Sequence, residues 1–267
     1  MSSSFESEAP VLTSRRKQHI LETLRRERQI VAKDLSKELA LSEDTIRRDL
    51  RELAAEGLLQ RVHGGALPAS PAVGDFAARL NVATDEKRSI GRGAALMVQP
   101  GQVVILDGGT TAMQMARSFA PELVATVVTH SATIAVELTT HPNIEVILIG
   151  GKLFKHSIVS VGAAAIEAIE RIHADSYFMG VTGVHPTVGL TTGDFEEAHV
   201  KRALSASAAE TVVLASSEKL NAVSAYVIAP LSEITGMIVA RDTKPEIIEI
   251  FSERGITVTK APLIGTS

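Results

Sequence analysis

Three segments rich in glycine and hydroxyl groups follow apolar stretches between residues 100 and 155, and their residue types suit anion binding. They read Asp107-Gly108-Gly109-Thr110-Thr111, Thr129-His130-Ser131 and Gly150-Gly151-Lys152. Glycine lets the backbone approach a ligand, N–H groups at a helix start can point at negative charge, and threonine hydroxyls add donors. Each segment alone is usually only a turn, and none forms a Rossmann GxGxxG or a Walker loop. Because they follow consecutive apolar segments, the three together predict a phosphate site.

The elements that must position these segments are apolar strands that alternate with amphipathic helices from residue 102 onward. We expect strands at residues 103–106, 124–128, 144–149, 176–180, 211–214, 226–228, 236–239 and 256–258. This alternation predicts an α/β fold with a doubly wound, mostly parallel sheet. In such sheets ligands bind beyond the carboxyl ends of the strands, so the three segments should converge there.

A different chemistry is indicated by Arg47, Arg48 and Arg51. Ser42 is a favourable N-cap for a helix that would carry them, and apolar residues recur at i, i+4 and i+7 between residues 46 and 53. The arginines then lie on the opposite, outward half of the helix. An exposed arginine face is either a solvated surface or a contact surface for nucleic acid, and this pattern alone leaves both open.

Two further helices are expected before this one. Residues 20–24 give the first an apolar stripe, and Val31, Leu35 and Leu39 give one to the second. The second would meet the arginine helix across residues 40–41, the short turn that a helix-turn-helix requires.

A β-ribbon is expected directly after the arginine helix. Gly57 would end the helix, residues 58–62 form a short β-prone run, and residues 63–65 turn the chain back. Together these elements predict a winged helix-turn-helix.

The charge distribution favours nucleic acid as the partner of this segment. The net charge of the chain is −4, but residues 14–66 hold 12 Lys and Arg against 9 Asp and Glu, or +3, which leaves −7 for the rest. The cationic excess is therefore confined to the region that would contact phosphates. Aromatic residues make up only 3% of the chain, which argues against a protein that stacks single-stranded bases.

Composition also excludes several classes of site. The chain has no Cys, so disulfides, catalytic thiolates and Cys-based zinc sites are ruled out. No apolar run is long enough to cross a bilayer, and residues 1–13 lack the features of a secretory leader. We expect a cytoplasmic protein with no membrane contact, no cofactor and a disordered start.

The sequence predicts four parts. Residues 1–13 would be the disordered start, residues 14–67 the winged helix-turn-helix, residues 68–83 a linker and residues 84–267 the α/β domain. The linker is expected because its Pro- and Gly-containing start cannot continue a helix or a central strand.

Residues 15–66, with "SEDTIRRDLRELAAEGLLQRVHGGA", resemble the signature of the DeoR family of bacterial transcriptional regulators. The resemblance implies that Thr45, Arg47 and Arg48 enter the major groove of DNA or touch its phosphates. It also implies that Arg61 and His63 approach the neighbouring backbone. The full set of predicted DNA-contacting residues is Ser42, Thr45, Arg47, Arg48, Arg51, Arg61 and His63.

The resemblance continues through "DGGTT", "THS", "GGK" and "GLTTGDFEEAHVKRAL". It implies an effector domain related in fold to ribose-5-phosphate isomerase and CoA transferases. Asp107 to Thr111 would hold the phosphate or sugar hydroxyls, and Lys201 and Lys219 would supply positive charge. The predicted effector-binding set is Asp107, Gly108, Gly109, Thr110, Thr111, Thr129, His130, Ser131, Gly150, Gly151, Lys152, Gly180, Glu197, Lys201 and Lys219. Where many relatives have Asp-Ser-Ser-Lys, this chain has Ser-Ser-Glu-Lys at residues 216–219.

Catalysis is the alternative, because an aldose–ketose isomerase needs a carboxylate base over the sugar carbons. Asp107, Asp194, Glu196 and Glu197 are candidates, although the last three could equally place negative charge at a helix start. A single E-x-x-H spacing at Glu196 and His199 is a weak indication of a metal site.

The sequence therefore predicts a repressor of a carbohydrate operon that releases its operator when a phosphorylated sugar binds. The DeoR resemblance further implies a homo-oligomer, a dimer or tetramer, on double-stranded operator DNA.

Overall fold

The computed structural model describes residues 13–70, 72 and 74–262, and the chain divides into two units, Met1–Ala69 and Ser70–Ser267. The disordered start predicted for residues 1–13 lies outside the described residues except for Thr13, where the first helix begins.

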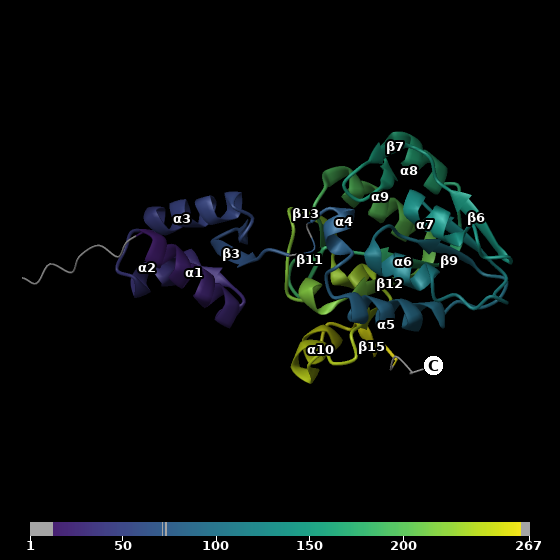
Figure 1. Ribbon diagram of the computed structural model, residues 1–267. Coiled ribbons are helices and arrows are strands. Elements are labelled where there is room, and N and C mark those ends of the chain that lie inside the picture. The colour runs from purple at the N-terminus through teal and green to yellow at the C-terminus, as the bar shows by residue number, and fades with distance from the viewer. Residues whose placement is uncertain (1–12, 71, 73, 263–267) are drawn as a thin grey trace, which may run out of the picture. The chain divides into compact units, whose positions relative to one another are not determined.

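The first unit combines helices with a small antiparallel sheet (Figure 1). Its elements are α1 (Thr13–Glu27), β1 (Ile30–Val31), α2 (Ala32–Glu38), α3 (Glu43–Ala55), β2 (Leu59–Val62) and β3 (Gly65–Pro68). The sheet order is β1-β3-β2, and the β2–β3 hairpin forms the wing. This is the predicted winged helix-turn-helix.

Apolar residues at helical spacing form the core of the first unit. Ile46, Leu50 and Leu53 of α3 pack with Ile20 and Leu24 of α1, and none is more than 3% exposed. The predicted apolar stripe of the arginine helix is therefore confirmed.

A buried ion pair adds a polar tie between α1 and α3. The guanidinium group of Arg16 donates to both carboxylate oxygens of Asp49, and the Nη2–Oδ1 distance is 3.0 Å. This hydrogen bonding raises the pKa of Arg16. The pair fixes how α3 sits on the unit, because a bidentate arginine–carboxylate contact has a defined geometry.

Val31 was expected on the apolar stripe of the second helix, and this was wrong. It lies in β1, precedes α2 and is 44% exposed. Ile30 and Val31 instead pair with Ala66 and Gly65 of β3. A β-carbon on Gly65 would lie 1.7 Å from the carbonyl oxygen of Ile30, so this pairing requires glycine. A two-residue strand is too short to show a period of its own.

The second unit is built on a seven-stranded parallel sheet with the order β15-β14-β12-β9-β4-β5-β6. Its strands are β4 (Val103–Leu106), β5 (Ala125–Thr129), β6 (Ile144–Leu148), β9 (Ala174–Gly180), β12 (Ala208–Ala215), β14 (Gly236–Val239) and β15 (Thr257–Lys260). Its helices are α4 (Phe76–Arg79), α5 (Thr84–Ala95), α6 (Thr110–Ala116), α7 (Ala132–Leu138), α8 (Ala163–Ile169), α9 (Phe195–Ala206) and α10 (Pro245–Ser252), with short 3₁₀ turns η2 (Ser217–Lys219) and η3 (Leu231–Glu233).

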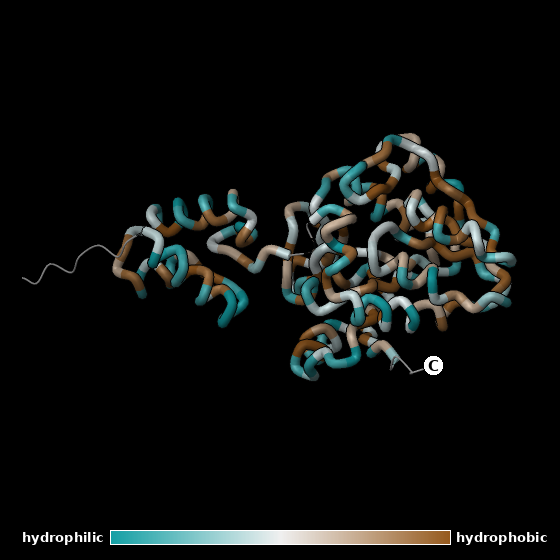
Figure 2. Tube along the Cα trace, in the orientation of Figure 1, coloured by the Kyte–Doolittle hydropathy of each residue, from teal (hydrophilic) through white to brown (hydrophobic). Residues whose placement is uncertain are grey.

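Alternate residues of each strand face two separate cores. Ile105 and Met179 belong to the core that includes residues of α8, α9 and α10, whereas Leu106 and Phe178 belong to the core with α5, α6 and α7. Figure 2 shows the interior strands as largely hydrophobic segments. Helices thus cover both faces, which confirms the doubly wound fold.

Smaller sheets hold strands that the alternation did not predict. β7 (Lys152–Phe154) pairs with β8 (Val159–Val161), and β10 (Gly183–His185), β11 (Gly189–Thr192) and β13 (Tyr226–Ala229) form an antiparallel sheet. The strand expected at residues 226–228 therefore exists as β13, but the parallel sheet was the wrong partner for it. A short β-prone run does not specify which strand it pairs with.

The segment expected to be a linker, residues 68–83, contains part of the second unit. The backbone N–H of Ser70 donates to the carbonyl of Val223, and that of Phe76 donates to the carbonyl of His156 at 2.8 Å. Phe76 is buried, and α4 follows with Asp75 as its N-cap. The two units divide between Ala69 and Ser70, and composition gave no sign of the tertiary contacts that fix the residues beyond this point.

Candidate functional site

The first candidate site is the surface of α3 and the wing. Ser42 caps α3, with its Oγ accepting from the backbone N–H of Thr45 at 3.2 Å and lying 2.9 Å from the hydroxyl of Thr45. Glu43 and Asp44 occupy the first turn, where negative charge favours a helix. The cap thus fixes where the arginine-bearing helix begins.

Arg47, Arg48 and Arg51 are all exposed, as the helical spacing predicted. Arg47 lies 2.8 Å from Glu43. In the part of the chain that the structure describes, neither Arg48 nor Arg51 forms an ion pair. Their guanidinium groups are therefore available to phosphates and base edges.

The wing contributes two further exposed side chains, Arg61 on β2 and His63 at the turn. Gly64 in this turn has a φ of +78°, a conformation that glycine adopts without strain. Arg61 and His63 thus remain on the predicted DNA-contacting surface.

The second candidate site is a polar pocket in the second unit. It lies beyond the carboxyl ends of the central strands β4 and β9, as expected for this class of sheet. Its polar lining residues are Arg79, Lys87, Thr110, Thr111, Ser157, Thr182, Thr192, Glu197, Lys201 and Lys219, with backbone from Gly108, Gly109 and Gly180. These residues come from α4, α5, α6, α9, η2 and the ends of strands.

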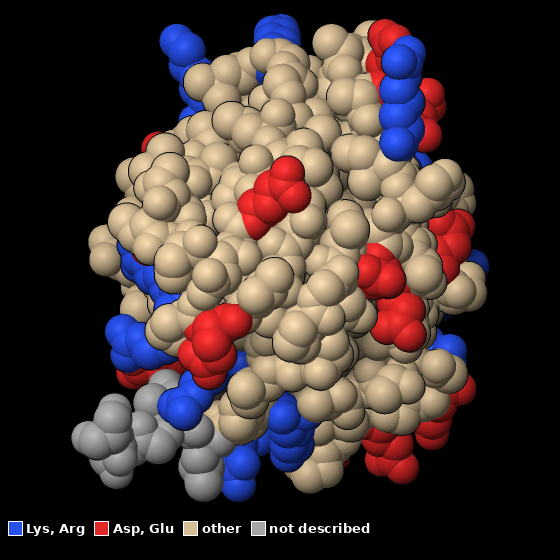
Figure 3. Space-filling model, turned by 90° about the vertical axis from the view of Figure 1, so that its right-hand side faces the viewer, with Lys and Arg blue, Asp and Glu red and all other residues tan. Residues whose placement is uncertain are grey.

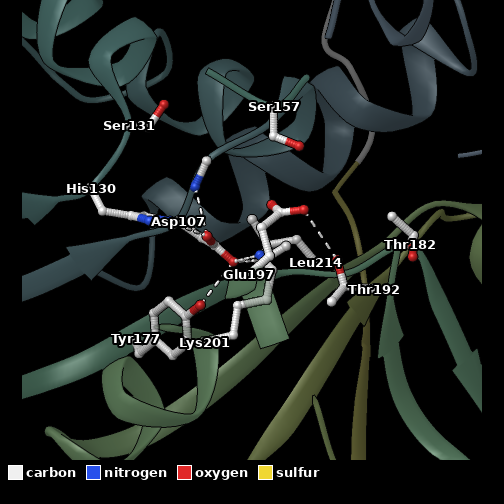
Figure 4. Close-up of polar contacts among 12 residues, drawn as sticks. Asp107, His130, Ser131, Ser157, Tyr177, Thr182, Thr192, Glu197, Lys201 and Leu214 are labelled. Carbon is white, nitrogen blue, oxygen red and sulfur yellow. Dashed lines mark hydrogen bonds and ion pairs between the residues drawn. The ribbon is translucent and has the colours of Figure 1, made fainter. Parts of the chain in front are cut away.

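Asp107 anchors a buried polar network beneath the pocket (Figure 4). Its Oδ1 lies 2.8 Å from Nε2 of His130, and its Oδ2 accepts from the hydroxyl of Tyr177 at 2.8 Å and from Nζ of Lys201 at 2.6 Å. The backbone N–H groups of Gly108 and Gly180 also donate to this carboxylate. Asp107 is wholly buried.

This geometry corrects the role expected for Asp107. Burial by itself would raise the pKa of its carboxyl, but Lys201 and His130 more than offset this and hold the pKa well below its usual range. The same carboxylate raises the pKa of Tyr177, to which burial contributes most. Both oxygens of Asp107 are used within the protein and the residue does not line the pocket, so its carboxylate positions Lys201.

Four cationic side chains line the pocket. Lys87, Lys201 and Lys219 are only 3%, 4% and 6% exposed, and Arg79 is half-buried. Nη2 of Arg79 lies 3.4 Å from the hydroxyl of Ser157, and Nζ of Lys219 lies 3.3 Å from the hydroxyl of Thr111. These hydrogen bonds are long, so both cations are weakly satisfied by the protein alone.

Burial lowers the pKa of Lys219, Lys87 and Arg79. It brings the pKa of Lys219 to about 8, which Glu218 opposes and which Lys87 and Arg79 lower further. Burial likewise lowers the pKa of Lys87, partly offset by Glu218, whose Oε1 lies 3.9 Å from Nζ of Lys87. A bound anion would relieve this crowding of positive charge.

In the segment of residues 216–219, Glu218 supplies the carboxylate. Ser216 is wholly buried and donates its hydroxyl to Oε1 of Glu218 at 2.8 Å. The carboxylate beside Lys87 therefore comes from Glu218, two residues further along.

The glycines after β4 act differently from one another. A β-carbon on Gly108 would lie 2.3 Å from Cγ1 of Val159, so Gly108 is required by packing against β8. Gly109 has a φ of +112° and allows the chain to turn into α6, which presents Thr110 and Thr111 to the pocket.

The expected convergence of three loops is wrong. Thr129, His130 and Ser131 are wholly buried and do not line the pocket. His130 contacts Asp107, the hydroxyl of Thr129 donates to the carbonyl of Leu106, and Ser131 pairs with Val159 of β8. They support the pocket from behind, because β8 covers the end of β5.

Gly150, Gly151 and Lys152 lie further away, after the edge strand β6, and are exposed. Two strand spacings, about 10 Å, separate β6 from β4 in the sheet. A position directly after a strand correctly predicted that the first loop lines the pocket. Whether the other loops lie beside it depends on the order of the strands in the sheet, which could not be read from the sequence.

Several pocket residues were not predicted: Arg79, Lys87, Ser157, Thr182 and Thr192. Arg79 fell in the expected linker, and Lys87 in the first part of an ordinary amphipathic helix. Thr192 lies 3.4 Å from Glu197, which was predicted and does line the pocket. A basic residue at the end of a four-residue helix, such as Arg79, or in the first turn of a helix, such as Lys87, gives no signal by itself.

The other candidate residues at the start of α9 have local roles or face solvent. Asp194 caps α9 by accepting from the backbone N–H of Glu197 at 3.0 Å, and Glu196 is exposed. The ring of His199 meets that of Phe195 edge to face, with the ring centroids 4.6 Å apart. Among the described residues, no cluster of three His, Asp or Glu could hold a metal ion.

Family models match both units, as a DeoR-like helix-turn-helix domain over residues 16–72 and as a DeoR C-terminal sensor domain over residues 82–241. The chain belongs to the DeoR family. The transcriptional repressor GlcR of Bacillus subtilis is 32% identical to this DeoR-family chain over 89% of it and 92% of GlcR. The glycerol-3-phosphate regulon repressor of Escherichia coli K12 is 30% identical over 69% of the chain and 74% of the repressor.

These relatives are named as transcriptional regulators or repressors and not as enzymes, and this chain is likewise a DNA-binding regulator. Ribose-5-phosphate isomerase A from Methanocaldococcus jannaschii is a more distant structural neighbour, with a TM-score of 0.38 and 20% identity. The similarity covers 51% of this chain and 53% of the isomerase chain. Nothing about activity follows from it. Across the described residues, no helix is both long and apolar enough to span a membrane.

Proposed function

We propose that this DeoR-family chain is a cytoplasmic repressor of a carbohydrate-catabolic operon, released from its operator when a phosphorylated sugar binds the second unit. The cluster of Arg79, Lys87, Lys201 and Lys219 around one pocket carries the effector half. Buried cations with lowered pKa values favour a compact, multiply charged anion such as a phosphate monoester.

The rest of the lining supports a sugar as the body of the ligand. Thr110, Thr192, Ser157 and Glu197 offer hydroxyl and carboxylate groups that can bond to several hydroxyls of one small molecule. The name of one relative, the glycerol-3-phosphate regulon repressor, supports the same class of effector.

The DNA half rests on α3 and the wing. We propose that Arg48 and Arg51 contact the major groove or its phosphates, with Ser42, Thr45 and Arg47 at the start of the helix and Arg61 and His63 on the wing beside it. We also propose that the chain binds as a homo-oligomer to two related half-sites, since symmetric proteins and symmetric operators match.

Regulation requires the effector to distinguish two states. A ligand lowers operator affinity only if it binds the arrangement that cannot bind DNA better than the one that can. By thermodynamic linkage, operator DNA must then lower the affinity for the effector by the same factor.

Fluorescence anisotropy with the region upstream of the chain's own operon tests both halves. We expect binding at low salt, and release on addition of one member of a panel of sugar phosphates, with the unphosphorylated sugars as controls. Calorimetry on the same panel measures effector binding separately. If the chain binds DNA but no member of the panel binds or changes operator affinity, the effector half is wrong.

A further inference from the structure

The two edges of the seven-stranded sheet differ in character. β15, at one edge, reads Thr-Val-Thr-Lys, the polar and charged composition that discourages a strand from pairing with another chain. β6, at the other edge, reads Ile-Glu-Val-Ile-Leu, with Ile147 and Leu148 41% and 52% exposed. Among the described strands, β6 pairs only with β5. An apolar, unpaired edge of this kind is expected where another molecule covers it.

An apolar groove lies beside this edge. Five apolar residues line the groove. Ile147 and Leu148 of β6 form one wall, and the others, from α8 and the turn after it, are Ala164, Ala168 and Ile172. The polar side chains in the lining are Glu167 and Arg171, which are mostly exposed. We call this surface, β6 with α8, the β6–α8 face.

The surroundings of this face carry little charge. Figure 3 shows the side of the second unit on which β6 lies in Figure 1, and only isolated acidic side chains interrupt its central area. Figure 2 shows β6 as a hydrophobic stretch at the edge of the unit. An area with few charged side chains, next to the exposed apolar side chains of Ile147 and Leu148, is typical of a protein interface.

The two charges in the groove favour a second copy of this chain as the occupant. Glu167 of α8 and Arg171, two residues after the end of this helix, pair with each other at 2.8 Å. In a two-fold interface, if one residue contacts a second residue of the other copy, the second contacts the first in the same way. Antiparallel α8 helices would therefore place Glu167 of each copy against Arg171 of the other. Opposite charges at this spacing make the face complementary to itself.

We propose that two copies of the chain join through their β6–α8 faces, with the edge strands side by side and the α8 charges crossing the two-fold axis. This rests on the proposed function in assuming that the chain acts as an oligomer. It adds the surface that forms the contact and the residues that hold it.

Sedimentation velocity on the full chain over a range of protein concentrations tests the apolar part of the face. Ile147→Glu should raise the dissociation constant of the dimer roughly tenfold or more, because it places a charge in the apolar centre of the contact. Leu96→Glu is the matched control, since Leu96 is 69% exposed at the end of α5. The control should leave the dimer unchanged.

A charge-swap experiment separates contacts between copies from contacts within one helix. Glu167→Arg alone and Arg171→Glu alone should each weaken self-association, because like charges then face each other across the axis. A mixture of the two variants should form a mixed dimer, since one copy then carries only positive and the other only negative side chains there. A pair that acts only within α8 gives no such recovery on mixing.

Three results would overturn the proposal, and they point to different errors. A dimer or tetramer that is insensitive to Ile147→Glu and to the charge swaps would mean that copies join elsewhere, and the oligomeric repressor would stand without this interface. A chain that is monomeric even on operator DNA would remove both. A monomeric chain that sediments with neutral phosphatidylcholine vesicles, and loses this with Ile147→Glu, would make a lipid surface the occupant.

Discussion

The α3 surface and the pocket of the second unit both carry cationic side chains, but in opposite environments. Arg48 and Arg51 stand in solvent on α3, whereas Lys87, Lys201 and Lys219 are at most 6% exposed. Exposed cations suit a long polyanion, whose condensed counterions are released on contact. Buried cations have already lost hydration, so one small anion with complementary charge can bind them strongly.

The comparison also explains why the pocket has an internal carboxylate and the α3 surface needs none. Asp107 compensates Lys201 when the pocket is empty, at a distance of 2.6 Å. Water does the same for Arg48 and Arg51. Substitutions in the pocket network should therefore affect the stability of the second unit, whereas substitutions on the α3 surface should affect DNA binding.

The largest effect should come from Asp107→Asn, which keeps the size of the side chain but removes its charge. We expect the second unit to lose about 3–5 kcal/mol of stability, because Lys201 is left buried without an ionised partner. Urea denaturation of the full chain measures this. Asp175→Asn is a control in the same unit: its carboxylate accepts from the backbone N–H of Val103 at an exposed site, and the loss should stay near 1 kcal/mol. Similar losses for both would mean that the Asp107 network is not a major source of stability.

Lys219→Met should be next. We expect the affinity for the effector found in the panel to fall roughly 10- to 100-fold, since a charge-assisted hydrogen bond contributes about 1.5–3 kcal/mol. Isothermal calorimetry gives the affinity directly. Lys152→Met should have no effect, because Lys152 is exposed and lies outside the pocket lining. An effect of Lys152→Met as large as that of Lys219→Met would restore the original three-loop site.

Arg48→Ala sharpens the other side of the comparison. Operator affinity should fall by about 1–3 kcal/mol if Arg48 reads a base edge, and the salt dependence should weaken by about one ion if it contacts a phosphate. Anisotropy titrations at several salt concentrations distinguish the two. Arg48→Ala should leave effector affinity unchanged. The control is Arg88→Ala, at an exposed arginine of the second unit, which should leave DNA binding unchanged. Loss of effector binding with Arg48→Ala would show that α3 has a structural role.

The smallest effect should be a pH dependence of effector binding. Lys219 has a pKa of about 8 in the empty pocket, so it is mostly charged at pH 7 and loses its proton as the pH rises through 8. Anion affinity should fall about fivefold between pH 8 and pH 9, following the charged fraction of this one group. Calorimetry across this range should show the fall in the unchanged chain and not in Lys219→Met. A flat profile in both would mean that Lys219 does not contact the anion.

Sequence patterns were reliable where the physical cause was local. The N-cap at Ser42, the outward arginines of α3 and the glycine turn after β4 each depend on a few neighbouring residues, and all three are found in the structure. They failed where a distant segment decides. Gly150 to Lys152 followed a strand as expected, but β6 lies at the edge of the sheet and not beside the pocket.

The pocket itself shows the division most clearly. The amino-acid sequence determined that Asp107 to Thr111 end a strand and begin a helix, because strand propensity, glycine torsion and helix capping act over a few bonds. Only the tertiary structure decided that the carboxylate of Asp107 is bound by the side chains of His130, Tyr177 and Lys201. It also decided that Arg79 and Lys87 line the pocket. Electrostatic contacts depend on distance in space, and the order of strands in a sheet is fixed by the packing of both its faces.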